Sequence, residues 1–209
     1  MNQIIVPDWP IPQKKFELLA LQELLKNEKI ARVVEIGTWM GGTAILWAAM
    51  VSRHEGGRVY CCDLSFFYGT FYAAYNGKTY DKLMYKGTEF EKYITEFMGD
   101  THDPAYIARV HNEVGLGTID FMFIDGDHTY EGVKADFYNF SPLVKPGGYV
   151  AFHDILKTDD HISRGCRVEE FWTEIKNKYE YWEFIDNNSY PCFHESMPAH
   201  CMGIGVLRV

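Results

Sequence analysis

The chain has 209 residues and a hydrophobic content of 47%, which is enough for one domain with a real core and argues against disorder. Its formal net charge is −9 and no dense lysine and arginine cluster stands out, so binding to nucleic acid is not expected. The five cysteines form no CxxC pair, and no stretch reaches the roughly 18 apolar residues of a membrane span. These features predict a cytoplasmic protein with reduced thiols and no membrane segment.

Strand and helix patterns alternate along the chain, and glycine or acidic residues close several of the strands. In chain order, the expected elements are a helix over 14–28, a strand over 31–37, a helix over 41–54, strands over 57–65 and 94–100, a helix over 104–113, a strand over 118–127, a helix over about 131–140, a strand over 149–155, a helix over 167–179, and strands over 180–186 and 201–209. The segment KPGG at 145–148 is expected to form the turn into the fifth strand.

Strands that are separated by helices predict right-handed crossovers and a parallel sheet with helices on both faces. Only a loop separates the last two strands, which indicates an antiparallel hairpin at one edge. We therefore expect one α/β domain over 1–209, with a doubly wound, mostly parallel sheet of seven strands and an antiparallel C-terminal edge hairpin.

Two segments do not fit a minimal α/β unit. Residues 64–97 hold eleven of the chain's 33 aromatic residues in about a sixth of its length, and residues 187–200 form a second irregular insert. Either segment fits a lid or pocket wall, and either fits equally well the interface of a homo-oligomer, where aromatic residues are also enriched.

The segment VVEIGTWMGG reads as a strand, a glycine turn and a helix start, an arrangement that turns backbone N–H groups toward an anionic ligand. The spacing Gly37-x-x-x-Gly41-Gly42 places Trp39 where the dinucleotide fingerprint has its second glycine. Close contact with a pyrophosphate is therefore disfavoured, and the absence of GK[ST] excludes a P-loop. The remaining candidate for the ligand of this turn is a molecule that carries a single carboxylate and a nucleoside.

Two acidic residues flank this turn in positions that suit such a ligand. Asp63 ends the second strand, where its carboxylate can accept hydrogen bonds from both ribose hydroxyls. Glu35 precedes the turn and can receive an ammonium group directly or through water, although a surface strand residue without a binding role is the alternative for Glu35.

Six polar residues are expected at the carboxyl ends of strands, where open α/β sheets bind ligands: Asp63, Asp100, Asp125, Asp127, His153 and Asp154. If the fourth and fifth strands are neighbours, Asp125 lies close to His153 and Asp154, and these groups repel one another or shift their pKa values unless a cation neutralises them. Oxygen ligands favour Mg²⁺, whereas the imidazole also suits Mn²⁺ or another transition ion. Asp127 is then free to act as a general base. The alternative for His153 is a packed histidine bonded to backbone.

Four segments, in this order, resemble class I S-adenosylmethionine-dependent methyltransferases: VVEIGTWMGG, FMFIDGDHTYEGVKADF, LVKPGGYVAFHDI and VEEFWTEIK. The resemblance spans about residues 31–180 and is strongest to the branch that includes cephalosporin-hydroxylase-like proteins and the macrolide and aminocoumarin sugar O-methyltransferases. It implies a Rossmann-like fold, S-adenosylmethionine as cofactor and a divalent cation, with Mg²⁺ as the first candidate.

The same resemblance assigns roles to individual residues. It implies cofactor binding by Glu35, Gly37, Thr38, Gly41, Gly42 and Thr43 at the methionine part, by Asp63 at the ribose, by Asp100 and Thr101 at the adenine, and by Asp125 and His128 nearby. Asp125, His153 and Asp154 match the metal ligands, and Asp127 matches the general base. His153 is a departure, because better-understood members carry an acidic residue there. The segment 64–97 has no counterpart, so the acceptor cannot be carried over.

The leading hypothesis is therefore metal-assisted O-methylation of a small hydroxylated acceptor such as a sugar or phenolic group. A metal-dependent hydroxylase-like enzyme and a non-catalytic cofactor-binding protein of the same fold are the alternatives. A NAD-dependent dehydrogenase is disfavoured by Trp39.

Overall fold

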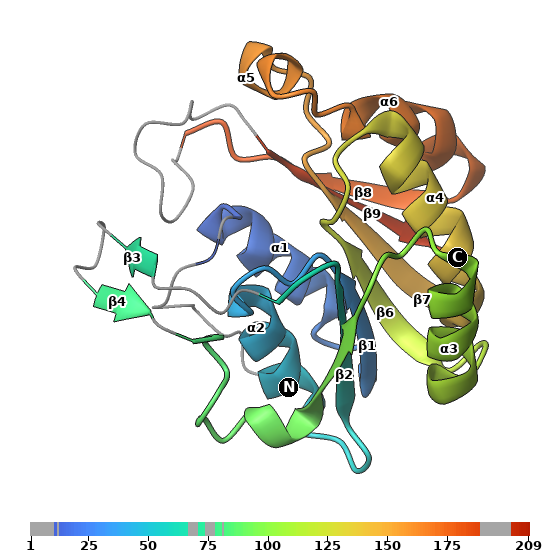
Figure 1. The fold of residues 1–209 in the computed structure, drawn as a ribbon. Coiled ribbons are helices and arrows are strands. Elements are labelled where there is room, and N and C mark those ends of the chain that lie inside the picture. Colours follow the sequence, from blue (N-terminus) through green and yellow to red (C-terminus); the bar gives the residue numbers. More distant parts are fainter. Residues whose placement is uncertain (1–10, 12, 67–70, 74–77, 81, 189–201) are drawn as a thin grey trace.

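The computed structural model describes residues 11, 13–66, 71–73, 78–80, 82–188 and 202–209, whose arrangement is shown in Figure 1. These residues form a seven-stranded sheet in the order β5-β2-β1-β6-β7-β9-β8 and a separate two-stranded sheet, β3-β4. The strands are β1 (Arg32–Ile36), β2 (Arg58–Asp63), β3 (Phe71–Ala73), β4 (Lys78–Tyr80), β5 (Ile94–Met98), β6 (Ile119–Ile124), β7 (Val144–His153), β8 (Glu180–Phe184) and β9 (Ile204–Arg208).

The strand directions confirm the predicted fold class. The pairs β1–β2, β1–β6, β2–β5 and β6–β7 are parallel, whereas β9 is antiparallel to both β7 and β8. The predicted edge hairpin is present, with β9 on its inner side and β8 outermost. Because five strands run in the same direction, their carboxyl ends share one edge of the sheet.

Helices cover both faces of this sheet. They are α1 (Lys15–Leu25), α2 (Gly42–Val51), α3 (Pro104–Val114), α4 (Tyr130–Phe140), α5 (Asp159–Ser163) and α6 (Val168–Ile175), with short 3₁₀ turns at Glu91–Tyr93, Ser141–Leu143 and Lys176–Lys178. One core cluster joins α1 and α2 to one face, and a second joins α3, α4 and α6 to the other (Figure 1). Alternation along each strand divides the side chains between the clusters: Val33 belongs to the first and Val34 to the second.

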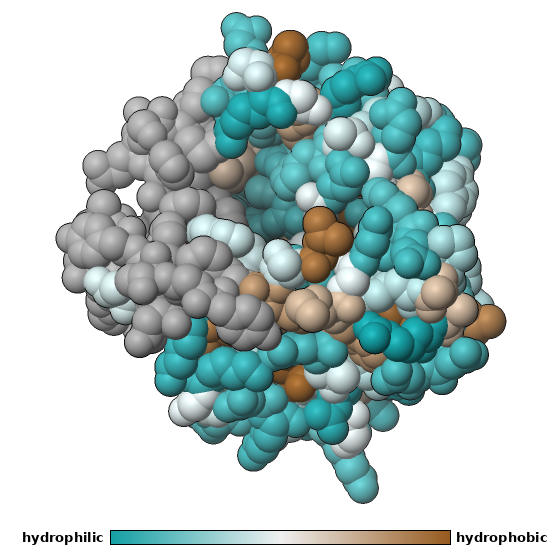
Figure 2. Space-filling view, in the orientation of Figure 1, coloured by the Kyte–Doolittle hydropathy of each residue, from teal (hydrophilic) through white to brown (hydrophobic). Residues whose placement is uncertain are grey.

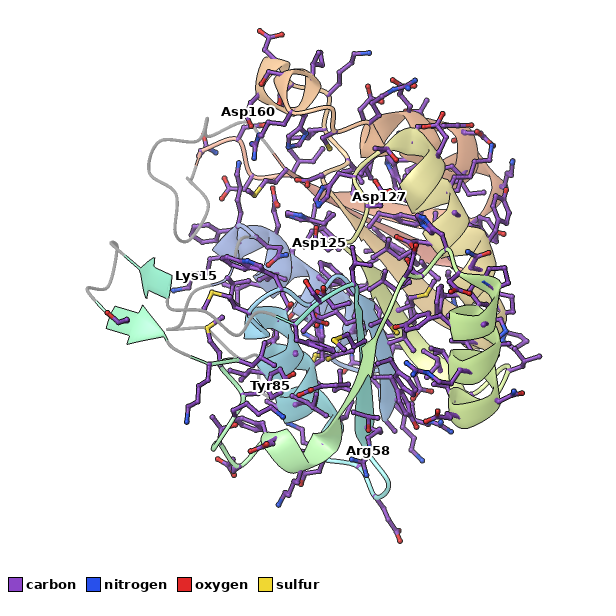
Figure 3. All side chains as sticks on the ribbon, in the orientation of Figure 1. Lys15, Arg58, Tyr85, Asp125, Asp127 and Asp160 are labelled. Carbon is purple, nitrogen blue, oxygen red and sulfur yellow. The ribbon has the colours of Figure 1, made fainter. Side chains whose placement is uncertain are left out.

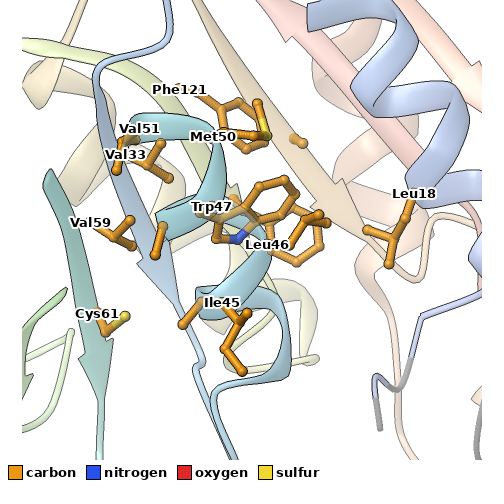
Figure 4. Packing of buried hydrophobic residues seen from close by; sticks show 14 of the residues in the cluster. Leu18, Val33, Ile45, Leu46, Trp47, Met50, Val51, Val59, Cys61 and Phe121 are labelled. Atoms are coloured by element: carbon orange, nitrogen blue, oxygen red, sulfur yellow. The ribbon is translucent and has the colours of Figure 1, made fainter. Parts of the chain in front are cut away.

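Helix α2 is buried on all sides, which explains why its sequence is apolar throughout. Its Trp47 packs edge-on against Phe121 with the ring centroids 5.1 Å apart (Figure 4). Part of the aromatic-rich segment 64–97 belongs to the same core cluster, through the buried residues Leu83, Met84 and Tyr85. The described C-terminal part of this segment therefore packs into the hydrophobic core beside α2, in addition to any role at a pocket or an interface.

Some local features differ from the sequence-based expectations. KPGG lies inside β7 as an irregularity. Ile119 of β6 pairs with Val144 of β7 and Phe121 pairs with Tyr149, so one residue of β6 lies opposite the four residues of KPGG. The short α5 and the β3–β4 pair were not expected. Most of the predicted insert 187–200 lies outside the described residues. Among the described residues, no helix has the length and apolar character needed to cross a bilayer.

Candidate functional site

A cavity of about 1280 Å³ opens at the carboxyl ends of the parallel strands. Figure 2 shows the hollow on this face, with hydrophilic side chains along its described rim. It lies where the strand order reverses, since β1 is flanked by β2 on one side and β6 on the other. The predicted site residues that line it are Gly37, Thr38, Gly42, Thr43, Asp63, Asp100, Thr101, Asp125, Asp127, His128, His153 and Asp154.

The glycine loop, residues 37–42, requires glycine for two separate reasons. Gly37 and Gly41 both have φ +81°, a left-handed conformation that side chains disfavour. A Cβ on Gly37 would lie 2.0 Å from the backbone oxygen of Asp125, and one on Gly41 would lie 2.5 Å from the ring of Tyr85. The loop therefore packs directly against the end of β6, which places the two strand ends side by side at the cavity. Gly41 itself faces the core and does not line the cavity.

Asp63 holds this loop in place. Its Oδ2 accepts hydrogen bonds from the backbone N–H groups of Thr38 and Trp39, both at 2.8 Å, and its Oδ1 accepts one from Ser65 at 3.0 Å. The carboxylate predicted to bind ribose therefore also ties β2 to the turn after β1. Its Oδ1 has only one donor among the described residues, so it retains the capacity to accept a further hydrogen bond.

Glu35 lies beneath the loop and not in the cavity lining. Strand alternation turns its side chain toward α2, where Oε1 accepts a 2.8 Å hydrogen bond from the indole N–H of Trp47 and Oε2 lies 3.7 Å from Cys61 Sγ. Burial raises the pKa of the Glu35 carboxyl to about 7, although hydrogen bonds from Thr43 and Trp47 favour the anion. Glu35 is fully buried and does not line the cavity, so its predicted role in cofactor binding stays a prediction.

The ends of β6 and β7 bring Asp125 close to His153 and Asp154, as expected for neighbouring strands, and His128, which was expected on the cofactor side, joins them. Asp125 Oδ1 lies 3.1 Å from His153 Nδ1, which is also 3.5 Å from Asp154 Oδ1. His128 reaches the same group, with Nδ1 2.7 Å from Asp154 Oδ2 and Nε2 3.7 Å from Asp125 Oδ1. We call Asp125, His128, His153, Asp154 and His161 the histidine–carboxylate cluster. Figure 3 places Asp125 near the centre of the molecule and Asp127 beside the start of α4.

Charges within the cluster compensate one another. Burial disfavours the imidazolium of His153, but the charges of Asp154 and Asp125 outweigh it and raise the pKa of His153 well above its usual value. Burial likewise opposes ionisation of Asp154, yet the charge of His153 and hydrogen bonds from His128 hold its pKa well below the usual value. The imidazoles and carboxylates of the cluster thus favour each other's charged forms, and a cation bound here would compete with the imidazole protons.

The backbone conformation of Asp154 and a side-chain contact from Gln13 also shape the cluster. Asp154 has φ +63°, a conformation that is uncommon for residues other than glycine and that concentrates at functional sites. Gln13, which precedes α1, donates a hydrogen bond to Asp125 Oδ2. Buried His153 Nε2 and Gln13 Oε1 have no hydrogen-bond partner among the described residues. Such orphaned polar atoms indicate a site that is completed by a bound group or by water.

Asp127 and the adenine-side residues occupy the rim. Asp127 is exposed, and its Oδ1 accepts a 2.9 Å hydrogen bond from the backbone N–H of Thr129, the N-cap of α4. Thr101 donates a 2.7 Å hydrogen bond to Asp136, a fully buried residue of α4 whose pKa is raised by burial to about 6. Asp136 therefore links the loop after β5 to α4, behind the turn that carries Asp127.

Several residues of the site were not predicted from the sequence. They are Gln13, Asp136, Asp160, His161, Arg164 and Cys166. His161 lies in the short helix α5 and Cys166 in the loop between α5 and α6, where no periodicity or motif points to a partner. The glycine loop and the strand-end residues were identifiable because strand ends of a parallel sheet must meet at one edge.

Comparisons with known proteins agree with this geometry. Residues 34–155 match the family described as a methyltransferase domain. The chain is 28% identical over 137 residues to demethylmacrocin O-methyltransferase of Streptomyces fradiae, an alignment that covers 62% of the chain and 28% of that protein. The chain spans 15% to 28% of the length of the curated relatives it matches.

Two solved structures share the fold. An O-methyltransferase from Bacillus cereus in complex with SAH superimposes with a TM-score of 0.63 at 17% identity, covering 98% of this chain and 84% of that one. The MycE methyltransferase from the mycinamycin biosynthetic pathway, in complex with Mg, SAH and mycinamycin VI, gives 0.54 at 17% identity and covers 90% and 48%. At these identities the likeness concerns the fold.

Proposed function

The chain belongs to the family of methyltransferase domains, and we propose that it transfers a methyl group from S-adenosylmethionine to a hydroxyl oxygen of a small acceptor, assisted by a divalent cation. The observation that carries the proposal is that three groups of residues meet at the same cavity. The glycine loop, Asp63 and the histidine–carboxylate cluster face one cavity at the switch in strand order. The cavity volume of about 1280 Å³ leaves room for a nucleoside cofactor together with an acceptor.

The glycine loop and Asp63 suit the cofactor. The loop approaches the end of β6 without side chains in between, and Asp63 keeps one carboxylate oxygen available for a ribose hydroxyl. Asp100 and Thr101 line the cavity beyond Asp63, in the direction expected for an adenine. Bound S-adenosylmethionine supplies an electrophilic methyl group, while these residues orient it and keep its sulfonium at a fixed place.

The cluster suits a divalent cation. Ligand atoms of Asp125, His153 and Asp154 lie within 4.8 Å of one another, and two of these residues offer carboxylate oxygens of the kind that Mg²⁺ prefers. A bound cation lowers the pKa of a ligated hydroxyl. Asp154, 7% exposed, and His153, 3% exposed, are shielded from water, so their orientation is fixed before a ligand arrives. Mg accompanies SAH in the solved structure of MycE, which makes Mg²⁺ the first ion to test.

Asp127 is the proposed base. It lines the cavity two residues beyond Asp125, and among the residues that the structure describes only its Oδ1 is hydrogen-bonded, to the backbone N–H of Thr129. Its other oxygen can accept the proton of an acceptor hydroxyl. On the side of the cavity away from the glycine loop, Asp160 and Arg164 of the α5 region form an ion pair at the rim. This polar rim fits a hydroxylated acceptor such as a sugar. One relative is by its name an O-methyltransferase of demethylmacrocin, which supports oxygen as the methylated atom.

The proposal is tested with the variant Asp127→Asn in a panel of sugars and phenols, with methyl donor and with or without Mg²⁺, read by product mass. We expect kcat to fall about 10²- to 10⁴-fold while the Kd for S-adenosylmethionine, measured by calorimetry, stays within about twofold. Asp103→Asn is the matched control. Asp103 accepts a 2.7 Å hydrogen bond from the N–H of Ala105 at the start of α3, as Asp127 does beside α4, but it does not line the cavity.

Full activity of Asp127→Asn contradicts the assignment of the base. Absence of binding to S-adenosylmethionine and its demethylated product in the unmodified protein contradicts the proposed function itself.

A further inference from the structure

We propose that His128, Asp154 and Cys166 form a second metal site, which binds a thiophilic divalent transition ion such as Zn²⁺. One ligand atom from each of the three residues lies within 4.8 Å of the others. His128 comes from the loop after β6, Asp154 from the end of β7, and Cys166 from the segment between α5 and α6. The site shares Asp154 with the set Asp125–His153–Asp154 but is otherwise separate, and it does not depend on methyl transfer.

The backbone brings Cys166 to the cluster in a defined position. The N–H of Arg167 donates a 2.8 Å hydrogen bond to the carbonyl of His128, and the N–H of Cys166 donates one of 2.9 Å to the carbonyl of His161. Cys166 is 9% exposed, so its thiol is turned inward. Residues that are 38 positions apart in the chain are thereby held beside each other by main-chain bonds, independently of any ion.

His161 fixes the position of Asp154 at this site. Its Nδ1 lies 2.7 Å from the carbonyl oxygen of Leu156, and because a carbonyl can only accept, Nδ1 carries a proton. Its Nε2 lies 3.3 Å from Asp154 Oδ1, whereas His128 Nδ1 contacts Asp154 Oδ2. The carboxylate of Asp154 is thereby held between the two rings.

Ligand chemistry separates the two sets. Asp125, His153 and Asp154 include no sulfur, whereas the second set combines imidazole, carboxylate and thiol. Thiolate and imidazole ligands select Zn²⁺ and related ions, and Mg²⁺ takes oxygen ligands and retains its waters. Binding at the second site converts the Cys166 thiol to a thiolate and releases its proton to solvent. His161, 3% exposed, supports the site by holding the other oxygen of Asp154.

The test uses the full, metal-stripped chain under reducing conditions, titrated with Co²⁺ and followed by absorption in the near-ultraviolet and visible. We expect a cobalt–thiolate charge-transfer band that saturates at one equivalent, is removed by Zn²⁺ and persists in a large excess of Mg²⁺. In Cys166→Ser the band is lost and affinity for Zn²⁺ falls at least ~10-fold. Cys62→Ser is the matched control, since Cys62 is a fully buried thiol outside the set, and it keeps the band.

A second measurement needs no variant. Alkylation of Cys166 by iodoacetamide, read by mass spectrometry of its peptide, should slow at least ~10-fold when Zn²⁺ is added. A missing thiolate band in the unmodified protein, a band that survives in Cys166→Ser, or alkylation that Zn²⁺ does not slow overturns the proposal. Neither measurement depends on binding of S-adenosylmethionine. A negative result therefore contradicts the second metal site and does not bear on the proposed function.

Discussion

The glycine-loop side of the cavity is formed by main chain, whereas the histidine–carboxylate side is formed by side chains that neutralise one another. On the first side, Gly37 touches the backbone of Asp125, and Asp63 accepts two backbone N–H groups. On the second, imidazoles of His128 and His153 face the carboxylates of Asp125 and Asp154. Steric fit therefore governs the first side and charge governs the second, so substitutions should fail differently on the two sides.

The largest effect is expected for Gly37→Ala. A Cβ there lies 2.0 Å from the Asp125 oxygen in a left-handed conformation, so we expect a loss of about 5 kcal/mol in the free energy of unfolding, or failure to fold. Urea denaturation provides the measurement. Gly56→Ala is the control, because Gly56 has φ +71° but no atom within 4 Å of the added Cβ. This control measures the cost of the left-handed conformation alone, about 1 kcal/mol. Equal losses of the free energy of unfolding in both variants would show that close packing at Gly37 does not contribute.

The charge side is tested by Asp154→Asn. Asparagine tolerates the left-handed conformation of this residue, so the change removes mainly the negative charge. At pH 7 we expect the free energy of unfolding to fall by about 4 kcal/mol, because in a buried setting the imidazole of His128 loses its closest anion and that of His153 loses one of its two. Asp160→Asn, which breaks the more exposed pair with Arg164, should change it by less than about 1 kcal/mol. Comparable losses in the two variants would contradict the compensation of charges.

A smaller, pH-dependent effect is expected for Glu35→Gln beneath the glycine loop. Because the folded pKa of about 7 exceeds the usual 4.5, the folded protein keeps a proton that the unfolded chain has lost between these values. Stability of the unmodified protein therefore falls as pH rises from about 4.5 to 7 and levels off above 7. Relative to it, the variant should gain up to roughly 3 kcal/mol over this interval. Thermal unfolding across pH 4 to 8 measures the difference in stability, and a difference that does not change with pH would show that folding does not raise the pKa of Glu35.

Much of the fold could be predicted because strands separated by helices leave few alternatives. The seven strands, the parallel core and the antiparallel edge all appear as expected. The KPGG segment was misplaced because a glycine pair reads equally well as a turn and as an irregularity within a strand. Helix α5 was missed because five residues do not show a helical period.

The candidate site divides in the same way. Asp63, Asp125, Asp127, His153 and Asp154 could be placed together because parallel strands end at a common edge, and all of them line the cavity. The burial of Glu35 under Trp47 could not be foreseen, since it depends on which face α2 covers.

What the sequence by itself determined is the set of groups at the strand ends, because strand boundaries and crossover direction follow from local pattern and chain chirality. Only the tertiary structure decided which of these groups face each other. His128 and Cys166 join Asp154 from two loops and His161 joins it from the short helix α5, and the positions of these segments depend on the whole surrounding core. The tertiary structure thereby decides how many charged groups of each sign meet in the cluster, and this number determines whether the cluster can bind a cation.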